Sequence, residues 1–208
     1  MLTGPLLRKL RQLRRNESGV AAVEFALIVP FMLALYFGSM EASVLFTADK
    51  RVNTVSATVG DLISQWDPNT SPPAIPQATL DGYFAAAQGI MRPYATAGVK
   101  QVVSLIWVAS DGSTKVLWSI ANGTGAVART ANLPFAPLST SSTTDIVARG
   151  GCIIAAEVTY SYKPLLGEVF TTAFNLSHTN YFVPRYGATG VIQIPSPTLT
   201  TTSCTTGS

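Results

Sequence analysis

A long apolar stretch near the N-terminus, GVAAVEFALIVPFMLALYFGSMEASVLF, constrains the fold of this chain more than any other feature. It runs from Gly19 to Phe46, and between Val20 and Met40 its only charged residue is Glu24. A helix of about 20 apolar residues is long enough to span the ~30 Å hydrocarbon core of a bilayer. We therefore predict a transmembrane helix over residues 20–46.

Charge is distributed unevenly on the two sides of this stretch. Residues 1–19 contain one acid, Glu17, and five basic residues, which are Arg8, Lys9, Arg11, Arg14 and Arg15. The positive-inside rule predicts that residues 1–19 are a cytoplasmic leader and that the chain after about residue 41 lies outside the cytoplasm, which in a bacterium is the periplasm. The basic sequence pI of about 9.0 arises from this leader. Because no later stretch interleaves Lys or Arg densely with aromatic residues, the sequence argues against nucleic-acid binding.

Glu24 does not fit a plain membrane anchor, because a carboxylate inside a span costs roughly 2–3 kcal/mol unless it finds a partner. Between the basic leader and the apolar helix stand Gly19, four small or apolar residues, and then Glu24 and Phe25. This arrangement resembles a prepilin cleavage site. The string Val-Glu-Phe-Ala-Leu-Ile-Val-Pro, with Gly38 and Glu41 downstream, resembles the TadE-like family of the tight-adherence (Tad/Flp) pilus machinery over roughly residues 15–50.

The resemblance implies a structural role rather than catalysis, and no cofactor. Members of the family are pseudopilins or minor pilins that a prepilin peptidase cuts, so we expect cleavage between Gly19 and Val20. Subunit packing is expected to involve Glu24 and Phe25, with Glu24 meeting the N-terminal amine that cleavage creates. The expected partners are the prepilin peptidase, the major pilin and other pilus subunits, and the bacterial inner membrane.

The helix is predicted to continue beyond the membrane to about residue 66. Apolar residues recur there at alternating spacings of three and four, which is typical of one buried helical face: Leu45, Ala48, Val52, Val55, Val59, Leu62 and Trp66. Asp67-Pro68 then ends the helix, because a residue that precedes proline is pushed out of the helical conformation.

Residues 67–193 are predicted to form an α+β head, with helix faces packed on one side of a small antiparallel sheet. We expect a helix over 77–91, a hairpin of strands 99–109 and 114–120, and strands over 152–162 and 176–185, with a short helix over 165–174. Residues 121–145 are interpreted as a long exposed loop, and residues 194–208 as a tail rich in Ser, Thr and Pro.

The predicted head contains few chemically reactive residues. Cys152 and Cys204 both lie on the oxidising side of the membrane, which favours a disulfide between them. Two cysteines and the single histidine, His178, fit no metal motif, so we expect neither a metal site nor a catalytic site. The stretch that begins at Asp111, DGSTK, starts like the metal loop of von Willebrand A domains, but Lys115 replaces the second serine and a turn fits better.

Two alternatives to a pilus subunit remain open at this stage. The first is an uncleaved, bitopic membrane protein with a periplasmic binding or adhesive domain. The second is a membrane-tethered hydrolase built on His178.

Overall fold

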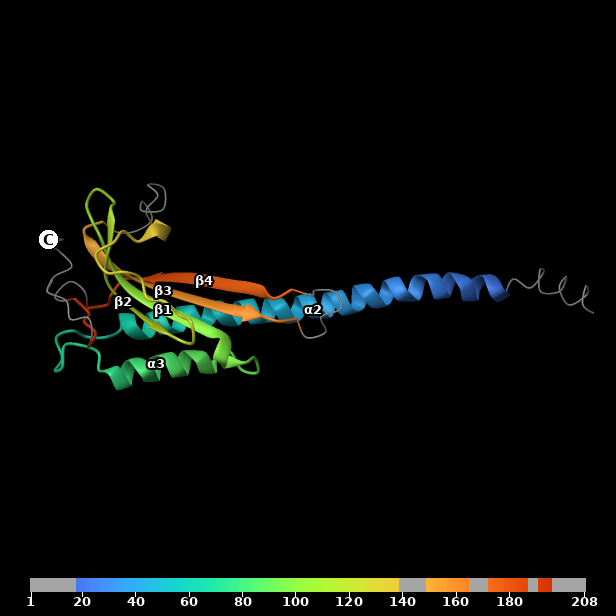
Figure 1. Ribbon diagram of the computed structural model, residues 1–208, viewed down its shortest axis with the longest axis horizontal. Coiled ribbons are helices and arrows are strands. Elements are labelled where there is room, and N and C mark those ends of the chain that lie inside the picture. Colours follow the sequence, from blue (N-terminus) through green and yellow to red (C-terminus); the bar gives the residue numbers. More distant parts are fainter. Residues whose placement is uncertain (1–17, 139–148, 165–171, 187–190, 196–208) are drawn as a thin grey trace, which may run out of the picture. The chain divides into compact units, whose positions relative to one another are not determined.

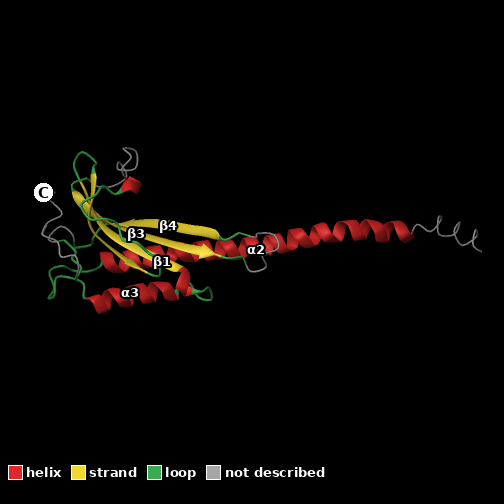
Figure 2. Ribbon diagram, viewed as in Figure 1, coloured by secondary structure: helices red, strands yellow, loops and turns green. Residues whose placement is uncertain are grey.

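The computed structural model describes residues 18–138, 149–164, 172–186 and 191–195. The expected leader, most of the predicted helix over 165–174, and the tail with Cys204 lie outside the described residues. Figures 1 and 2 show the elements, whose bounds are α2 (Ser18–Ser64), α3 (Gln77–Gly89), β1 (Val99–Val108), β2 (Thr114–Asn122), β3 (Gly151–Tyr162) and β4 (Phe174–Phe182), with short 3-10 turns at Thr96–Gly98 and Ala136–Leu138.

The chain divides into two compact units, of which one contains α2 up to Val44 and the other begins at Leu45 and contains every strand. In the first unit α2 exposes its apolar side chains, and Pro30 lies inside the helix without ending it. In the second unit one face of α2 is fully buried through Ala48, Val52, Val55, Val59 and Ile63. The buried stripe therefore ends on Ile63 rather than on the predicted Leu62 and Trp66, which are only half-buried.

The four strands form one antiparallel sheet in the order β2-β1-β3-β4. Helix α3 and the Leu45–Ser64 part of α2 lie on the same face of this sheet (Figure 1). The Gln101 side chain donates from Nε2 to the Phe84 carbonyl of α3 (3.3 Å), and the Ser56 hydroxyl of α2 donates to the Ala156 carbonyl of β3 (2.6 Å). These contacts confirm the predicted α+β architecture with its helices on one side.

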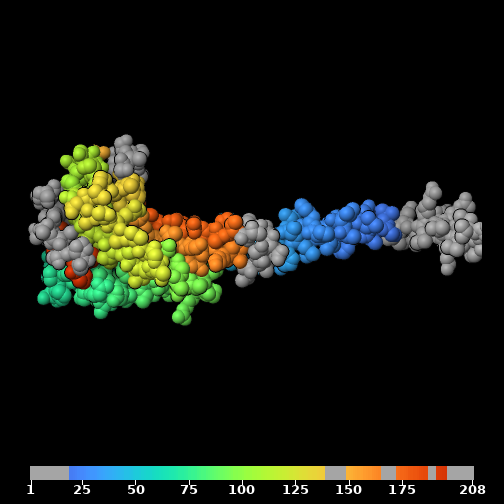
Figure 3. All heavy atoms as spheres, in the orientation of Figure 1, coloured from blue at the N-terminus to red at the C-terminus, as the bar shows by residue number. Residues whose placement is uncertain are grey.

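The opposite face of the sheet is partly covered by residues 123–138, shown in yellow in Figure 3. Phe135 and Leu138 of this segment are buried against apolar side chains of the sheet, namely Ile106, Val108, Val116, Ile153 and Ala155. Most residues between 121 and 138 are exposed, as predicted for the loop over residues 121–145, but residues 121–122 belong to β2, and Phe135 and Leu138 are buried. Phe135 and Leu138 help to hold this segment on the sheet, because each buries apolar area that water would otherwise hydrate.

Candidate functional site

The first part of α2 exposes apolar side chains on all its sides. An 18-residue window of this helix has a mean hydropathy of 2.2, and none of it is buried. The exposed large apolar residues between residues 20 and 37 are Val20, Val23, Phe25, Leu27, Ile28, Phe31, Met32, Leu33, Leu35, Tyr36 and Phe37. A helix that is apolar all round is normally found in a membrane or within a bundle of other helices. This surface indicates a membrane-anchored protein.

The predicted cleavage and packing residues all lie in the first two turns of α2. Gly19 has open space where a Cβ would stand, with no atom within 4 Å. Val20 is 57% exposed and Phe25 is 69% exposed. Glu24 lies one turn after Val20 and is exposed, and no basic side chain in the described part of the chain forms an ion pair with it.

The second glutamate of the motif has a different environment. Glu41 is 2% exposed, whereas Glu24 faces outward in the same helix. The two carboxylates are therefore not equivalent. Glu24 is accessible to a neighbouring molecule, and Glu41 is covered within its own chain.

Comparison with known families identifies this helix as the recognisable part of the chain. Residues 19–60 match the family model described as TadE-like protein. No curated protein and no solved structure matches the chain. The match confirms the resemblance seen in the motif, and the TadE-like family that residues 19–60 resemble is a structural component of Tad pili rather than an enzyme family. The match begins at Gly19 and covers both the exposed apolar part of α2 and most of its buried stripe.

In the head, β4 is joined to α2 by a row of polar contacts, which we call the polar seam. His178 Nε2 lies 2.7 Å from Asp49 Oδ1, Asn180 donates from Nδ2 to Asn53 Oδ1 (2.9 Å), and Arg185, just after β4, donates from Nη2 to Asp61 Oδ1 (2.6 Å). The residue numbers increase together along both elements, so β4 runs in the same direction as α2.

The seam accounts for His178, the one residue on which a hydrolase would depend. Asp49 is the only side chain that hydrogen-bonds to the His178 ring among the residues described. No hydroxyl or thiol nucleophile is therefore joined to the imidazole there, as a Ser-His or Cys-His mechanism requires. This pair could not be predicted from the sequence, because His178 and Asp49 are separated by most of the head.

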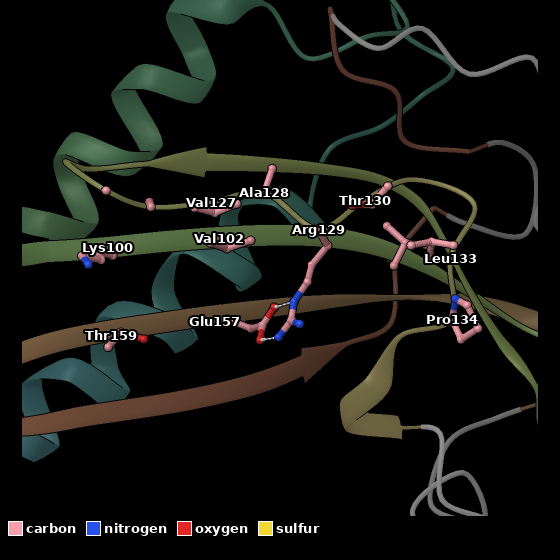
Figure 4. Close-up of a pocket in the computed structure, with 13 residues that line it drawn as sticks. Lys100, Val102, Val127, Ala128, Arg129, Thr130, Leu133, Pro134, Glu157 and Thr159 are labelled. Atoms are coloured by element: carbon pink, nitrogen blue, oxygen red, sulfur yellow. Dashed lines mark hydrogen bonds and ion pairs between the residues drawn. The ribbon is translucent and has the colours of Figure 1, made fainter.

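A cavity of about 530 Å³ lies between the outer face of the sheet and the segment that contains Arg129 (Figure 4). Arg129 crosses it to form a two-pronged ion pair with Glu157, with Nε–Oε2 at 2.9 Å and Nη2–Oε1 at 2.5 Å. Its guanidinium also lies 5.3 Å from the centre of the Phe135 ring. The hydrogen bond to Glu157 raises the pKa of Arg129 above its usual value.

The Glu157 side chain, which forms this pair, is only 16% exposed. Other polar groups at the cavity include the exposed Lys100 and the hydroxyl of Thr159, which lies 3.4 Å from the Ser177 hydroxyl. The ion pair satisfies both of its partners within the chain. We therefore interpret it as a clamp that holds residues 123–138 on the sheet.

The predicted turn and the predicted disulfide have different outcomes. Asp111 accepts a hydrogen bond from the Ser113 backbone N–H (2.8 Å), and Gly112 has a φ of 87°, which glycine adopts readily. The hydrogen bonds from Ser113 lower the pKa of Asp111. The turn is thus confirmed. Cys152 is buried in β3, but Cys204 lies outside the described residues, so their disulfide stays a prediction.

Proposed function

We propose that this protein is a TadE-like pseudopilin or minor pilin, a structural subunit in the assembly or at the tip of a Tad/Flp-type pilus that serves adhesion. The observation that carries the proposal is the exposed apolar surface of α2, which coincides with the start of the family match at residue 19. A single chain leaves this surface uncovered, and a membrane followed by a bundle of pilin helices would cover it. The subunit carries out no reaction of its own.

In this proposal the leader lies in the cytoplasm, α2 crosses the inner membrane, and the head lies in the periplasm before incorporation into the pilus. The basic residues before Gly19 and the sparse charge after the span support this orientation. A prepilin peptidase cuts between Gly19 and Val20. The open space around Gly19 is consistent with access for a peptidase.

Cleavage creates a positive α-amine on Val20 at the start of the apolar helix. Glu24 lies one turn away, on an exposed position from which it reaches either this amine or that of a neighbouring subunit. In a packed bundle the pairing with a neighbour neutralises both charges, and a slipped register leaves both unpaired. Removing one partner of a buried pair typically costs roughly 3–5 kcal/mol. The charge pair of Glu24 would therefore stabilise only the correct stacking of subunits.

The experiment that tests the proposal is mass spectrometry of the N-terminus of the protein from native membranes and from sheared pili. Wild type should begin at Val20. Gly19→Arg should remain uncut, because a large side chain obstructs the peptidase, and Gly4→Arg in the leader serves as the control that is still processed. A protein that begins at Met1 or Leu2 in membranes and is missing from pili would contradict the proposal and favour an uncleaved anchor.

A second measurement examines Glu24. Glu24→Gln should insert into the membrane as well as wild type but enter pili less efficiently. The comparison is made at equal membrane abundance, with Asp81→Asn on the exposed surface of α3 as a control for a lost carboxylate. Equal incorporation of Glu24→Gln and wild type would show that Glu24 has no charge partner in the pilus.

A further inference from the structure

Four basic residues gather at the end of the head where α2 enters it. We call Lys50, Arg51, Arg92 and Lys163 the basic end. Lys50 follows the exposed Phe46 by four residues, which in a helix is a rise of about 6 Å. The predicted span ends at residue 46, and the headgroup layer of a bilayer extends about 5–7 Å beyond its hydrocarbon core. Lys50 therefore lies at the depth of the headgroups.

A series of contacts brings the other members of the basic end to the same level. Arg51 donates from Nη1 to the Arg92 carbonyl (2.5 Å), and its guanidinium lies 5.9 Å from the centre of the Tyr94 ring. The Tyr94 ring packs edge to face on Tyr162, with ring centres 6.2 Å apart, and Lys163 follows Tyr162 at the end of β3. Helix α3 and strand β3 thus both end on the side of the head where α2 enters it (Figure 1).

Most of the charge at this end is not neutralised by the chain. The side chains of Lys50, Arg92 and Lys163 are exposed, and none of them forms an ion pair among the residues that the structure describes. The carboxylate next to Lys50 in the sequence, Asp49, is taken up by His178, whose Nε2 lies 2.7 Å from its Oδ1. The basic end therefore carries positive charge that can attract an anionic partner.

The cations lie on two sides of α2. Ala48 and Val52 are fully buried, and Lys50 is two residues from each of them, so at 100° per residue its side chain points away from the sheet. Lys163 lies on the other side, where it lines a cavity of about 320 Å³ together with Tyr94. A single small anion cannot reach both sides of a helix, whereas a bilayer surface that surrounds α2 reaches both.

We propose that the basic end docks on anionic phospholipid headgroups of the bilayer that α2 spans. A Lys or Arg near an anionic membrane surface strengthens binding about fivefold, and tyrosine rings are favoured at the same depth. The cavity beside Lys163, lined by Tyr94, Tyr160 and Tyr162, would receive the phosphate and glycerol of one lipid. The inference needs only the membrane anchor and does not depend on the pilus role. In a pilus, the subunit would give up this contact when it leaves the membrane.

The charges of the chain's own remaining segments fit the basic end less well. Residues 196–208 contain no charged side chain, and residues 165–171, which follow β3, contain one acid, Glu168. One carboxylate cannot neutralise cations on two sides of α2. An anionic membrane surface supplies many phosphates at the required depth, so we commit to the lipid as the partner.

The docking is tested by photo-crosslinking of the full-length protein in vesicles of phosphatidylcholine that contain about one quarter phosphatidylglycerol. A benzophenone amino acid replaces Ala95, an exposed residue that lines the cavity, or, as the control, Ser113 in the exposed turn. We expect Ala95 to capture phosphatidylglycerol at least about fivefold above its share of the lipid, and Ser113 to capture none. Adducts that merely follow the lipid composition, or an adduct of Ala95 with the chain itself in place of lipid, would overturn the proposal.

Two double variants with the same loss of charge isolate the basic end. Arg92→Gln/Lys163→Gln removes two of its cations, whereas Lys115→Gln/Arg149→Gln removes two near the opposite ends of the strands. With circular dichroism unchanged, the first variant should lower the phosphatidylglycerol enrichment at least about fivefold, and the second should not change it. Equal enrichment in both variants would refute the docking.

Inorganic phosphate distinguishes a membrane surface from a site for a free anion. At constant ionic strength it should leave the lipid adduct unchanged, and competition by phosphate would contradict a lipid surface. The vesicles contain neither a peptidase nor other pilus subunits. The docking can therefore fail while the pilin function stands, and the pilin function can fail while the docking stands.

Discussion

Gly60 of α2 lies directly against the Phe182 ring of β4, and its replacement by alanine has two opposing effects on stability. A Cβ on Gly60 would lie 2.3 Å and 2.5 Å from two ring atoms of Phe182 and 3.0 Å from the Cβ of Ala156. Carbon atoms in van der Waals contact are about 3.5–4.0 Å apart. The Phe182 ring or the strand that carries it must therefore move.

The expected change in the free energy of unfolding is the difference between the gain from replacing a helical glycine and the cost of overpacking. Alanine in place of glycine inside a helix stabilises by about 0.5–1 kcal/mol. Overpacking a well-filled site typically costs about 1–3 kcal/mol. Phe182 ends a strand that the polar seam holds against α2, so the ring has little freedom to retreat. We expect Gly60→Ala to destabilise the head by about 1–2 kcal/mol.

Urea unfolding of the detergent-solubilised full chain measures this effect through the fluorescence of its three tryptophans, Trp66, Trp107 and Trp118, which all lie in the unit that contains the sheet. With a denaturant slope of roughly 1–3 kcal/mol per molar urea, the midpoint should fall by about 0.5–1 M. Gly82→Ala in α3 is the matched control, because a Cβ there meets no atom within 4 Å, and its midpoint should rise.

A double variant identifies the cause of the loss. In a Phe182→Ala background the clash disappears, so Gly60→Ala should become neutral or stabilising. If Gly60→Ala instead stabilises the protein as much as Gly82→Ala does while Phe182 is present, then α2 and β4 are not packed as closely as the structure has them, and the reasoning is refuted.

Three further predictions concern the head. Arg129→Ala removes the ion pair with Glu157 and should lower the free energy of unfolding by no more than about 1 kcal/mol, because the Arg129 side chain is 40% exposed. It should nevertheless speed proteolytic cleavage within residues 123–138, the segment that this arginine holds on the sheet. An unchanged cleavage rate would argue against the clamp. Cys152 and Cys204 should resist alkylation in denatured protein until a reductant is added. Their disulfide would close a loop of about 50 residues, for which the chain-entropy model gives a stabilisation of about 4 kcal/mol. Two reactive thiols without reductant would disprove the disulfide. Burial raises the pKa of Tyr160. The contribution of this tyrosine to the free energy of unfolding is therefore complete below the unfolded pKa of about 10 and is lost as the pH rises through the higher folded pKa. Absorbance at 295 nm would follow the ionisation, and urea midpoints between pH 8 and 11 would follow the loss of stability.

Much of the fold could be predicted because its elements are long and strongly periodic. The apolar run and the stripe from Ala48 to Val59 predicted α2 as observed, and the β-branched runs predicted β1, β2 and β3 to within two residues. The motif around Glu24 made the resemblance to the TadE-like family recognisable, because a charge inside an apolar span is costly and seldom appears without a function. These signals are local in sequence.

The contacts that shape the candidate sites are not local, and they could not be predicted. The pairs of Arg129 with Glu157 and His178 with Asp49 join residues far apart in the chain, and single polar residues carry no periodic pattern. The burial of Phe135 and Leu138 was not predicted, because residues 121–145 contain many Gly, Pro, Ser and Thr and show no helix or strand period. The order β2-β1-β3-β4, which makes β4 an edge, likewise depends on pairing between distant strands.

The exposed apolar surface of α2 and the carboxylate of Glu24 would contribute to assembly in different ways. Burying a Leu, Ile or Phe side chain contributes about 1.5–3 kcal/mol, so a few of the exposed side chains of α2 outweigh any single polar contact of the head. This apolar surface, however, has little directionality, since side chains of similar size cover all its sides and many neighbours would suit it. A charge pair at Glu24 would form in one register only, because a slipped register leaves both charges unpaired. In the proposed assembly, therefore, α2 would supply most of the affinity for the pilus, and Glu24 would determine the register in which a neighbouring subunit packs.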